Sequence, residues 1–201
     1  MKLGIIIGST REGRKTDRQA KWIYNQAEKV EDVDAEIVDL RDYPMPFFDE
    51  PASPRYNPNR EIDPTAIRWL KKLESFDAYV FVTPEYNHSV TGVLKNALDY
   101  VTWEMQRKPV MVVSHGSAGG ARAATDLKEI ISESKAVPMP SSTPLAMVGM
   151  SELIDEDGQL TEAAEAKPYD LNDVAISALG ELKWYSDALA VARERELAAV
   201  S

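Results

Sequence analysis

The chain has 201 residues, of which 33 are acidic and 23 basic, with a formal net charge of −10 and no cysteine. This length is near the usual size of one α/β domain, so we expect a single domain over residues 1–201. The acidic balance argues against binding to nucleic acid or to an anionic membrane, because either partner needs a broad basic face. The lack of cysteine excludes disulfides, thiolate zinc sites and a cysteine nucleophile.

The N-terminal apolar run is short. Residues 3–7 form a five-residue run that is ended by Gly8 and Arg11, too short for the core of a signal peptide. No window of the sequence approaches the 18 apolar residues that a membrane-spanning helix needs. We therefore expect a cytoplasmic protein without a membrane partner.

Short and nearly continuous apolar runs recur along the chain, which is typical of strands covered on both faces. These runs are residues 3–7, 35–40, 78–83, 110–114 and, more weakly, 145–148. Apolar residues at helical spacing separate them, at residues 20–30, 65–74, 90–101 and 124–131, and residues 171–189 give a long closing helix. This alternating order predicts a three-layer α/β domain with a parallel sheet and right-handed crossovers.

Two segments lie outside this pattern. Residues 43–64 hold six of the twelve prolines, and a connection of this length is either functional or a disordered insertion. The aromatic residues in it favour an ordered loop that packs near a site or an interface. Residues 151–170 carry seven acids and one base, but the acids do not have the spacing of an EF-hand loop, so we expect a solvated acidic loop.

Ligands of parallel α/β sheets bind at the carboxyl ends of the strands, which makes residues 8–16, 84–89 and 114–120 the candidate loops. The first of them has glycines that allow sharp turns, hydroxyl groups and a helix start, which together favour a phosphate. Residues 11–21 carry five bases and two acids, so this is a local basic pocket in an acidic chain. The alternative is an ordinary helix N-terminus with a solvated, charged first turn.

Two known phosphate motifs fail in the first loop. Gly13 is followed by Arg14 before Lys15, one residue too many for a Walker loop, and the spacing of a dinucleotide fingerprint is also absent. Without those glycines, Asp39 at the end of the second strand is expected to be a surface or capping carboxylate rather than a ribose ligand.

The other two loops have features that suit a planar ligand. Residues 84–87 combine a fixed backbone with an aromatic ring and short polar groups, although a plain strand-to-helix turn would look the same. Ser89 is expected to cap the next helix. The glycines of residues 116–120 let the backbone approach a ligand closely. His88 and His115 lie in these loops, but no third ligand with suitable spacing accompanies them, so we expect no metal site.

Three segments resemble the NADPH-dependent FMN reductase family, which includes quinone, azo and chromate reductases. They are residues 8–11 (GSTR), 84–99 (PEYNHSVTGVLKNALD) and 116–123 (GSAGGARA). The resemblance covers roughly residues 1–150, and the middle segment is long enough to be specific. It implies a flavodoxin-like α/β fold, a three-layer α-β-α sandwich with a five-stranded parallel sheet in the order 2-1-3-4-5, and FMN as the bound cofactor.

The family pattern, carried over residue by residue, implies that Ser9, Arg11 and Thr16 hold the FMN phosphate. The resemblance also implies which residues line the flavin ring on its two sides: Pro84, Glu85, Tyr86 and Asn87 on one, and Ser114, His115, Gly116 and Gly119 on the other. Two departures stand out. Thr91 occupies a position where the family usually has proline, and Asp17 follows Thr16, which places a negative charge near the phosphate.

The resemblance implies an oxidoreductase in which the flavin carries the chemistry, so that no catalytic side chain is needed. NADPH or NADH reduces FMN, and a small acceptor, such as a quinone, azo compound, flavin or metal oxyanion, takes the electrons. A homodimer or homotetramer is implied, with the helix after Ser89 at the interface. Tyr100 and Trp103 lie outside the apolar stripe of this helix, so we expect them to face a partner subunit. The alternative is a flavodoxin-like electron carrier without nicotinamide activity, against which the arginines of the first loop argue.

Overall fold

The computed structural model describes residues 1–57, 59–140, 153–165 and 170–200. Its five strands form one parallel sheet in the order β2-β1-β3-β4-β5, as the flavodoxin-like fold requires. The strands are β1 (Lys2–Ile7), β2 (Asp34–Asp39), β3 (Ala78–Pro84), β4 (Pro109–His115) and β5 (Val137–Pro138). Ile7 pairs with Asp39 on one side and Val82 on the other, so neighbouring strands end at the same edge of the sheet.

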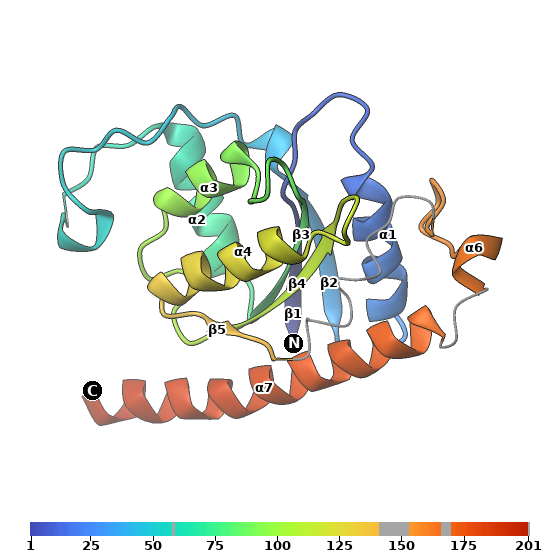
Figure 1. Ribbon diagram of the computed structural model, residues 1–201. Helices are drawn as coiled ribbons and strands as arrows, with labels where there is room; N and C mark the ends of the chain where they lie inside the picture. The colour runs from blue at the N-terminus through green and yellow to red at the C-terminus, as the bar shows by residue number, and fades with distance from the viewer. Residues whose placement is uncertain (58, 141–152, 166–169, 201) are drawn as a thin grey trace.

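Helices cover both faces of the sheet (Figure 1). Two 3₁₀ helices and six α-helices are described: η1 (Leu40–Asp42), η2 (Pro54–Tyr56), α1 (Thr16–Ala27), α2 (Pro64–Glu74), α3 (Gly92–Asp99), α4 (Ala121–Glu133), α6 (Glu162–Glu165) and α7 (Leu171–Val200). One core cluster joins α2, α3 and α4 to the sheet, and the other joins α1 and α7 to its opposite face. Among the described residues, no helix has both the length and the apolar character needed to cross a bilayer.

The burial of the strands explains why their sequences are nearly continuous apolar runs. Every residue of β3 and β4 is buried, because helices cover both faces of these central strands. The edge strand β2 has only one buried residue, Val38. The largest fully buried side chains, which include Trp22, Trp69, Tyr79 and Phe81, belong to the two layers of core on either side of the sheet.

The start of α3 differs from the expectation. Thr91, not Ser89, caps this helix, and its Oγ1 accepts a hydrogen bond of 3.1 Å from the amide of Leu94. Ser89 instead exchanges two backbone hydrogen bonds with Tyr86, of 3.0 and 3.1 Å. The prediction failed because both hydroxyl residues precede the helix, and only the reverse turn at Tyr86 to Ser89 decides which of them reaches the first free amides.

The fifth strand and the end of α3 also differ from the expectation. The observed β5 is only two residues long, whereas the predicted strand at residues 145–148 lies outside the described residues. Tyr100 is buried in the core of its own chain, so its expected position facing a partner subunit is wrong. Trp103 lies beyond the end of α3 and is about half exposed, with the side chains of Arg55 and Lys135 over its ring.

The described part of the acidic segment, residues 153–165, contacts α1, while its acidic side chains Glu156, Asp157 and Glu162 are exposed as expected. Leu153 and Ile154 are buried, and the Asp155 carboxylate accepts hydrogen bonds from two backbone amides within its own turn, at 2.8 and 2.9 Å. Gly158 has a φ of +75°, and a Cβ there would lie 2.7 Å from the backbone nitrogen of Trp22. Glycine is therefore required for this turn to touch the helix.

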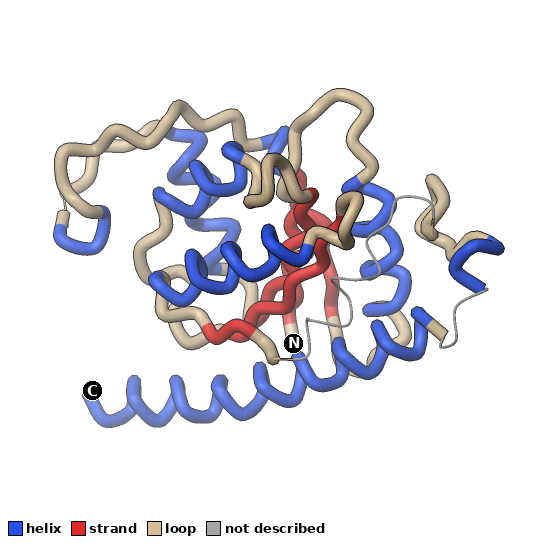
Figure 2. The backbone as a smooth tube through the Cα atoms, in the orientation of Figure 1, coloured by secondary structure: helices blue, strands red, loops and turns tan. Residues whose placement is uncertain are grey.

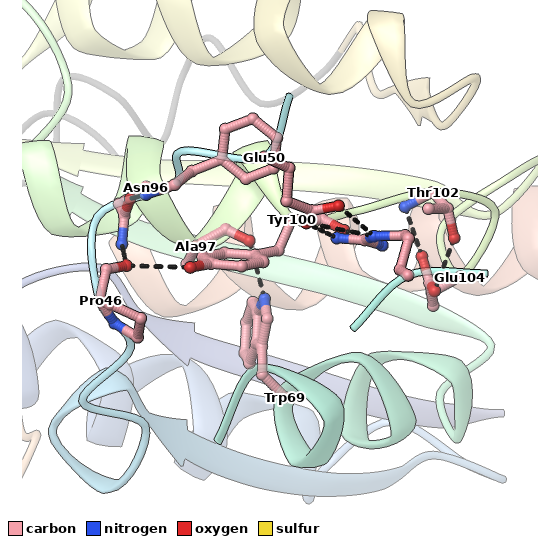
Figure 3. A network of polar contacts seen from close by, with 10 residues as sticks. Pro46, Glu50, Trp69, Asn96, Ala97, Tyr100, Thr102 and Glu104 are labelled. Carbon is pink, nitrogen blue, oxygen red and sulfur yellow. Dashed lines mark hydrogen bonds and ion pairs between the residues drawn. The ribbon is translucent and has the colours of Figure 1, made fainter. Parts of the chain in front are cut away.

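The first half of the proline-rich loop is attached to α3 (Figure 3). The side chain of Asn96 donates to the carbonyl of Pro46 at 2.8 Å and accepts from the amide of Phe48 at 2.8 Å. The Tyr100 hydroxyl donates to the same Pro46 carbonyl at 3.2 Å. Because backbone groups of the loop are bonded to α3 and to the residue just after it, the loop has a fixed position beside the helix.

A second contact fixes the far half of this loop. Arg60 forms an ion pair with Glu50, with a shortest distance of 2.6 Å, and donates to the carbonyl of Tyr100 at 3.0 Å. Both charged side chains are about nine-tenths buried, so the pair is shielded from water. The ring of Phe48 packs edge-on against Tyr100 with centroids 5.3 Å apart, whereas Phe47 is 83% exposed.

Candidate functional site

The loops that follow β1, β3 and β4 meet at one end of the strands (Figure 2). A cavity of about 270 Å³ lies between them. It is lined by the side chains and backbone of Arg11, Arg14, Lys15, Pro84, Glu85, Tyr86, His115 and Gly116. The structure thus brings residues of the three predicted loops together at the carboxyl edge of the sheet.

The first loop turns sharply at Gly8. A Cβ at this position would lie 2.9 Å from the Leu94 side chain and 3.0 Å from the carbonyl of Val82, so a larger residue would force the loop away from β3 and α3. Thr91 donates its hydroxyl hydrogen to the carbonyl of Gly8. The departure from the usual proline at residue 91 therefore supplies both a helix cap and a tie between α3 and the first loop.

Ser9 and Arg11 both contact Tyr86. Ser9 is buried, with its Oγ 3.2 Å from the Tyr86 hydroxyl. The guanidinium carbon of Arg11 lies 5.4 Å from the centre of the Tyr86 ring, a cation–π contact. The first loop and the loop after β3 are thereby joined across the cavity, with one cationic and one aromatic side chain side by side.

His115 links all three loops. Its Nε2 lies 2.9 Å from the hydroxyl of Thr16, at the start of α1, and its carbonyl accepts from the amide of Glu85 at 2.8 Å. Burial, together with the positive charge of Arg11, lowers the pKa of His115 to about 4. The imidazole is neutral at pH 7, so it supports the loops by hydrogen bonding and is not a cationic proton donor.

The Glu85 carboxylate is directed at α4. It accepts hydrogen bonds from the amides of Arg122 at 3.0 Å and Ala123 at 3.5 Å, and it pairs with the Arg122 guanidinium at 3.1 Å. Burial raises the pKa of Glu85, but these hydrogen bonds and the charge of Arg122 outweigh it and hold the pKa below its ordinary value. Glu85 therefore caps the N-terminus of α4 with its side chain.

The tips of the second and third loops are tight turns. Asn87 and His88 have positive φ angles of 49° and 70°, which is the conformation of the two central residues of a type I′ turn. In the third loop, the hydroxyl of Ser114 donates to the carbonyl of Gly119 at 3.0 Å. A Cβ at Gly120 would lie 2.7 Å from the backbone nitrogen of His115. These turns shape the walls of the cavity through the backbone.

The predicted site residues thus fall into two groups. Six of them line the cavity directly: Arg11, Pro84, Glu85, Tyr86, His115 and Gly116. The other five belong to the same three loops and form hydrogen bonds and turns that hold the shape of these loops. They are Ser9, Thr16, Asn87, Ser114 and Gly119.

Arg14 and Lys15 line the cavity although neither was assigned a role from the sequence. The Arg14 side chain is only 5% exposed, and it forms a two-bond ion pair with Asp39. Asp39 also caps η1 by accepting from the amide of Arg41 at 2.9 Å, as a capping carboxylate would. The predicted parallel pairing of the first two strands could have indicated the contact between Arg14 and Asp39, because it places Asp39 at the end of β2 next to the first loop.

The composition of the cavity fits a phosphate-bearing, planar cofactor such as FMN. Three cationic side chains line it although the chain has a net charge of −10, and the ring of Tyr86 is beside them. The Nε of Arg14 is buried without a partner among the described residues, while its two terminal nitrogens are bonded to Ser9 and Asp39. A Cβ added at Gly116 would lie 3.3 Å from the Cβ of Glu85, so a larger residue at this position would press against the second loop.

Similarity to known proteins agrees with this reading. Residues 1–148 match the model of the family described as NADPH-dependent FMN reductase. The chain is 36% identical over 129 residues to an NAD(P)H-dependent FMN reductase of Schizosaccharomyces pombe, a match that covers 64% of each chain. It is 33% identical over 189 residues to an NADPH azoreductase of Bacillus sp., a match that covers 92% of each chain.

A solved structure shows the same fold. FerB, a flavoenzyme NAD(P)H:(acceptor) oxidoreductase from Paracoccus denitrificans, superposes with a TM-score of 0.68 at 23% identity, and the match covers 94% of this chain and 97% of FerB. The fold is shared at this level of identity, and the family match over residues 1–148 gives the assignment. The chain belongs to the NADPH-dependent FMN reductase family of oxidoreductases.

Proposed function

We propose that this protein is an NAD(P)H-dependent FMN reductase that passes electrons from nicotinamide through bound FMN to a small acceptor, such as a quinone, azo compound, flavin or metal oxyanion. The observation that carries the proposal is the cavity at the carboxyl edge of β1, β3 and β4, with its three cationic side chains and the ring of Tyr86. Family membership supports the reductase over a one-electron carrier.

In this proposal the first loop holds the FMN phosphate. Ser9, Arg11 and Thr16 are the phosphate residues, and the start of α1, where residue 15 provides no side-chain cap, adds its positive dipole end. Arg11 lines the cavity, whereas Ser9 and Thr16 are buried behind it and bonded to Tyr86 and His115. Through these hydrogen bonds, the two hydroxyl groups also fix the first loop relative to the loops that carry Tyr86 and His115.

The other two loops hold the flavin ring. Residues 84–87 line one side, chiefly through Tyr86 and the backbone, because the Glu85 carboxylate is bonded to α4. Ser114, His115, Gly116 and Gly119 border the other side. Bound FMN supplies hydride and electron transfer, and the protein supplies binding, orientation and the exclusion of water. The neutral imidazole of His115 bonds to Thr16 and its carbonyl bonds to Glu85, so His115 fixes the three loops around the flavin ring.

The acceptor and the assembly complete the proposal. A homodimer or homotetramer with α3 at the interface is supported by the exposed aromatic side chains of the segments that adjoin this helix, Phe47 and Trp103. A cytoplasmic location is supported by the use of a reduced nicotinamide as the electron donor.

The experiment that tests the proposal is flavin binding by the purified protein. We expect the preparation to absorb as oxidised flavin does, or the apoprotein to quench the fluorescence of added FMN in a saturable titration. A colourless protein that leaves FMN fluorescence unchanged would overturn the proposal. Binding of FMN without any reduction by NADPH or NADH would instead identify an electron carrier.

A further inference from the structure

Two guanidinium groups donate hydrogen bonds to the backbone of the first loop. Arg14 donates to the carbonyl of Ser9, and Arg41 donates to the carbonyls of Thr10 at 3.3 Å and Arg11 at 2.7 Å. Three consecutive carbonyls of the loop therefore accept from cationic side chains. Because a trans peptide places each carbonyl opposite the amide that follows it, the amides after these three carbonyls point in the other direction.

Asp39 joins the two arginines. Its Oδ1 accepts from Arg14 Nη1 at 2.7 Å and from the backbone amide of Arg41 at 2.9 Å, and its Oδ2 pairs with the other terminal nitrogen of Arg14. Burial raises the pKa of Asp39, but the hydrogen bonds and charges of the two arginines hold the pKa below its ordinary value. Asp39 is thus an anion at neutral pH, fixed at the end of β2 beside Ile7.

Asp39 is an anion bonded to a residue that lines the cavity proposed to bind a phosphate. Arg14 lines the cavity and keeps one buried nitrogen without a partner among the described residues, while its other two nitrogens are directed at Asp39 and Ser9. By charge alone, Asp39 weakens the binding of any phosphate nearby. By geometry, it orients the planar Arg14 fork and, through Arg41, the backbone of the loop.

We propose that Asp39 is a positioning residue that strengthens phosphate binding despite its negative charge, by holding Arg14 and Arg41 where they turn the carbonyls of residues 9–11 outward. Arg11 and Arg14, which line the cavity, are then kept beside the cofactor phosphate. This inference rests on the proposed function, because it takes FMN as the occupant of the cavity.

The test is the sign of the change in FMN affinity in Asp39→Asn. This variant keeps the size of the side chain and removes the charge that binds both arginines. If Asp39 positions the loop, the Kd for FMN rises by about tenfold or more, while the Kd for riboflavin, which lacks the phosphate, changes by less than about twofold. If Asp39 acts by repulsion alone, FMN binds more tightly in the variant.

The matched control is Asp42→Asn, which removes the same charge from an exposed residue three positions further on. FMN affinity should be nearly unchanged in this control, which separates positioning from net charge. If Asp39→Asn does not fold, as judged by circular dichroism, Arg41→Gln removes the donor to two of the carbonyls and should give the same selective loss of FMN affinity.

The outcomes separate this inference from the proposed function. A wild-type protein that binds no FMN overturns the proposed function and this inference with it. A wild-type protein that binds FMN, together with an Asp39→Asn variant that binds it equally well or more tightly, overturns only the positioning role. Equal losses of FMN and riboflavin affinity also overturn it, because they show that Asp39 acts through the stability of the fold.

Discussion

His115 has an environment that makes stability depend on pH. Its pKa is about 4 in the folded protein and about 6.5 in the unfolded chain, so the unfolded state binds more protons between these values. The free energy of unfolding should therefore fall as the pH drops from about 6.5 to 4, by up to about 3 kcal/mol from this residue.

Urea unfolding of the wild type and of His115→Gln, at a series of pH values, measures this contribution. Glutamine cannot titrate and can still bond to Thr16, so the variant should lose less stability than the wild type across that pH window. Parallel stability profiles for the two proteins would show that another group causes the dependence.

Arg11 is the cavity-lining cation whose side chain is exposed next to Tyr86. A charge-assisted hydrogen bond to a phosphate contributes about 1.5–3 kcal/mol, so Arg11→Ala should weaken FMN binding by that amount and leave riboflavin binding nearly unchanged. Arg18→Ala is the matched control, because Arg18 pairs with Glu156, away from the cavity. A similar effect of both variants on FMN affinity would indicate long-range charge rather than contact.

At the scale of elements, the turn at Gly158 joins the acidic segment to α1. Gly158→Ala must accept a φ of +75° and a Cβ 2.7 Å from the Trp22 backbone, so it should lower the free energy of unfolding by at least about 2 kcal/mol. Gly180→Ala, at an exposed helical position of α7 with open space around it, should raise stability by up to about 1 kcal/mol. Thermal or urea unfolding measures both, and equal effects would contradict the close contact.

We predict that the proline-rich loop, which is bonded to α3, forms one wall of the acceptor site. Phe47 is 83% exposed while its neighbour Phe48 packs on Tyr100, so the two rings contact different surroundings. Phe47→Ala should change the KM or the preference among quinone and azo acceptors and leave FMN affinity intact. Tyr56→Ala, an equally exposed ring in the same loop, is the control. Unchanged kinetics with every acceptor would show that Phe47 has no part in the site.

At the scale of the whole molecule, the sequence predicts the elements that burial dictates. The central strands read as apolar runs because helices cover both of their faces, and α1, α2, α4 and α7 show apolar residues at helical spacing. The observed β5 has only two residues, too few to stand out from a loop. The sequence therefore predicts the strands that are long and buried on both faces, and it does not predict the short strand β5.

The site was predictable only in its location. The three loops follow from strand order, but the direction of each side chain depends on contacts between residues far apart in the chain. Arg14 meets Asp39 because β1 and β2 pair in parallel, and Glu85 turns to α4 because free amides at Arg122 and Ala123 need an acceptor. No local pattern encodes such pairings.

The measurement that tests the central claim most directly is an anaerobic titration of the FMN-loaded protein with NADPH and with NADH, followed by visible absorption. We predict that about one equivalent of at least one nicotinamide bleaches the absorbance of the bound flavin, and that an added quinone restores it. A bound flavin that stays oxidised with both donors would contradict the claim that this protein is an NAD(P)H-dependent reductase.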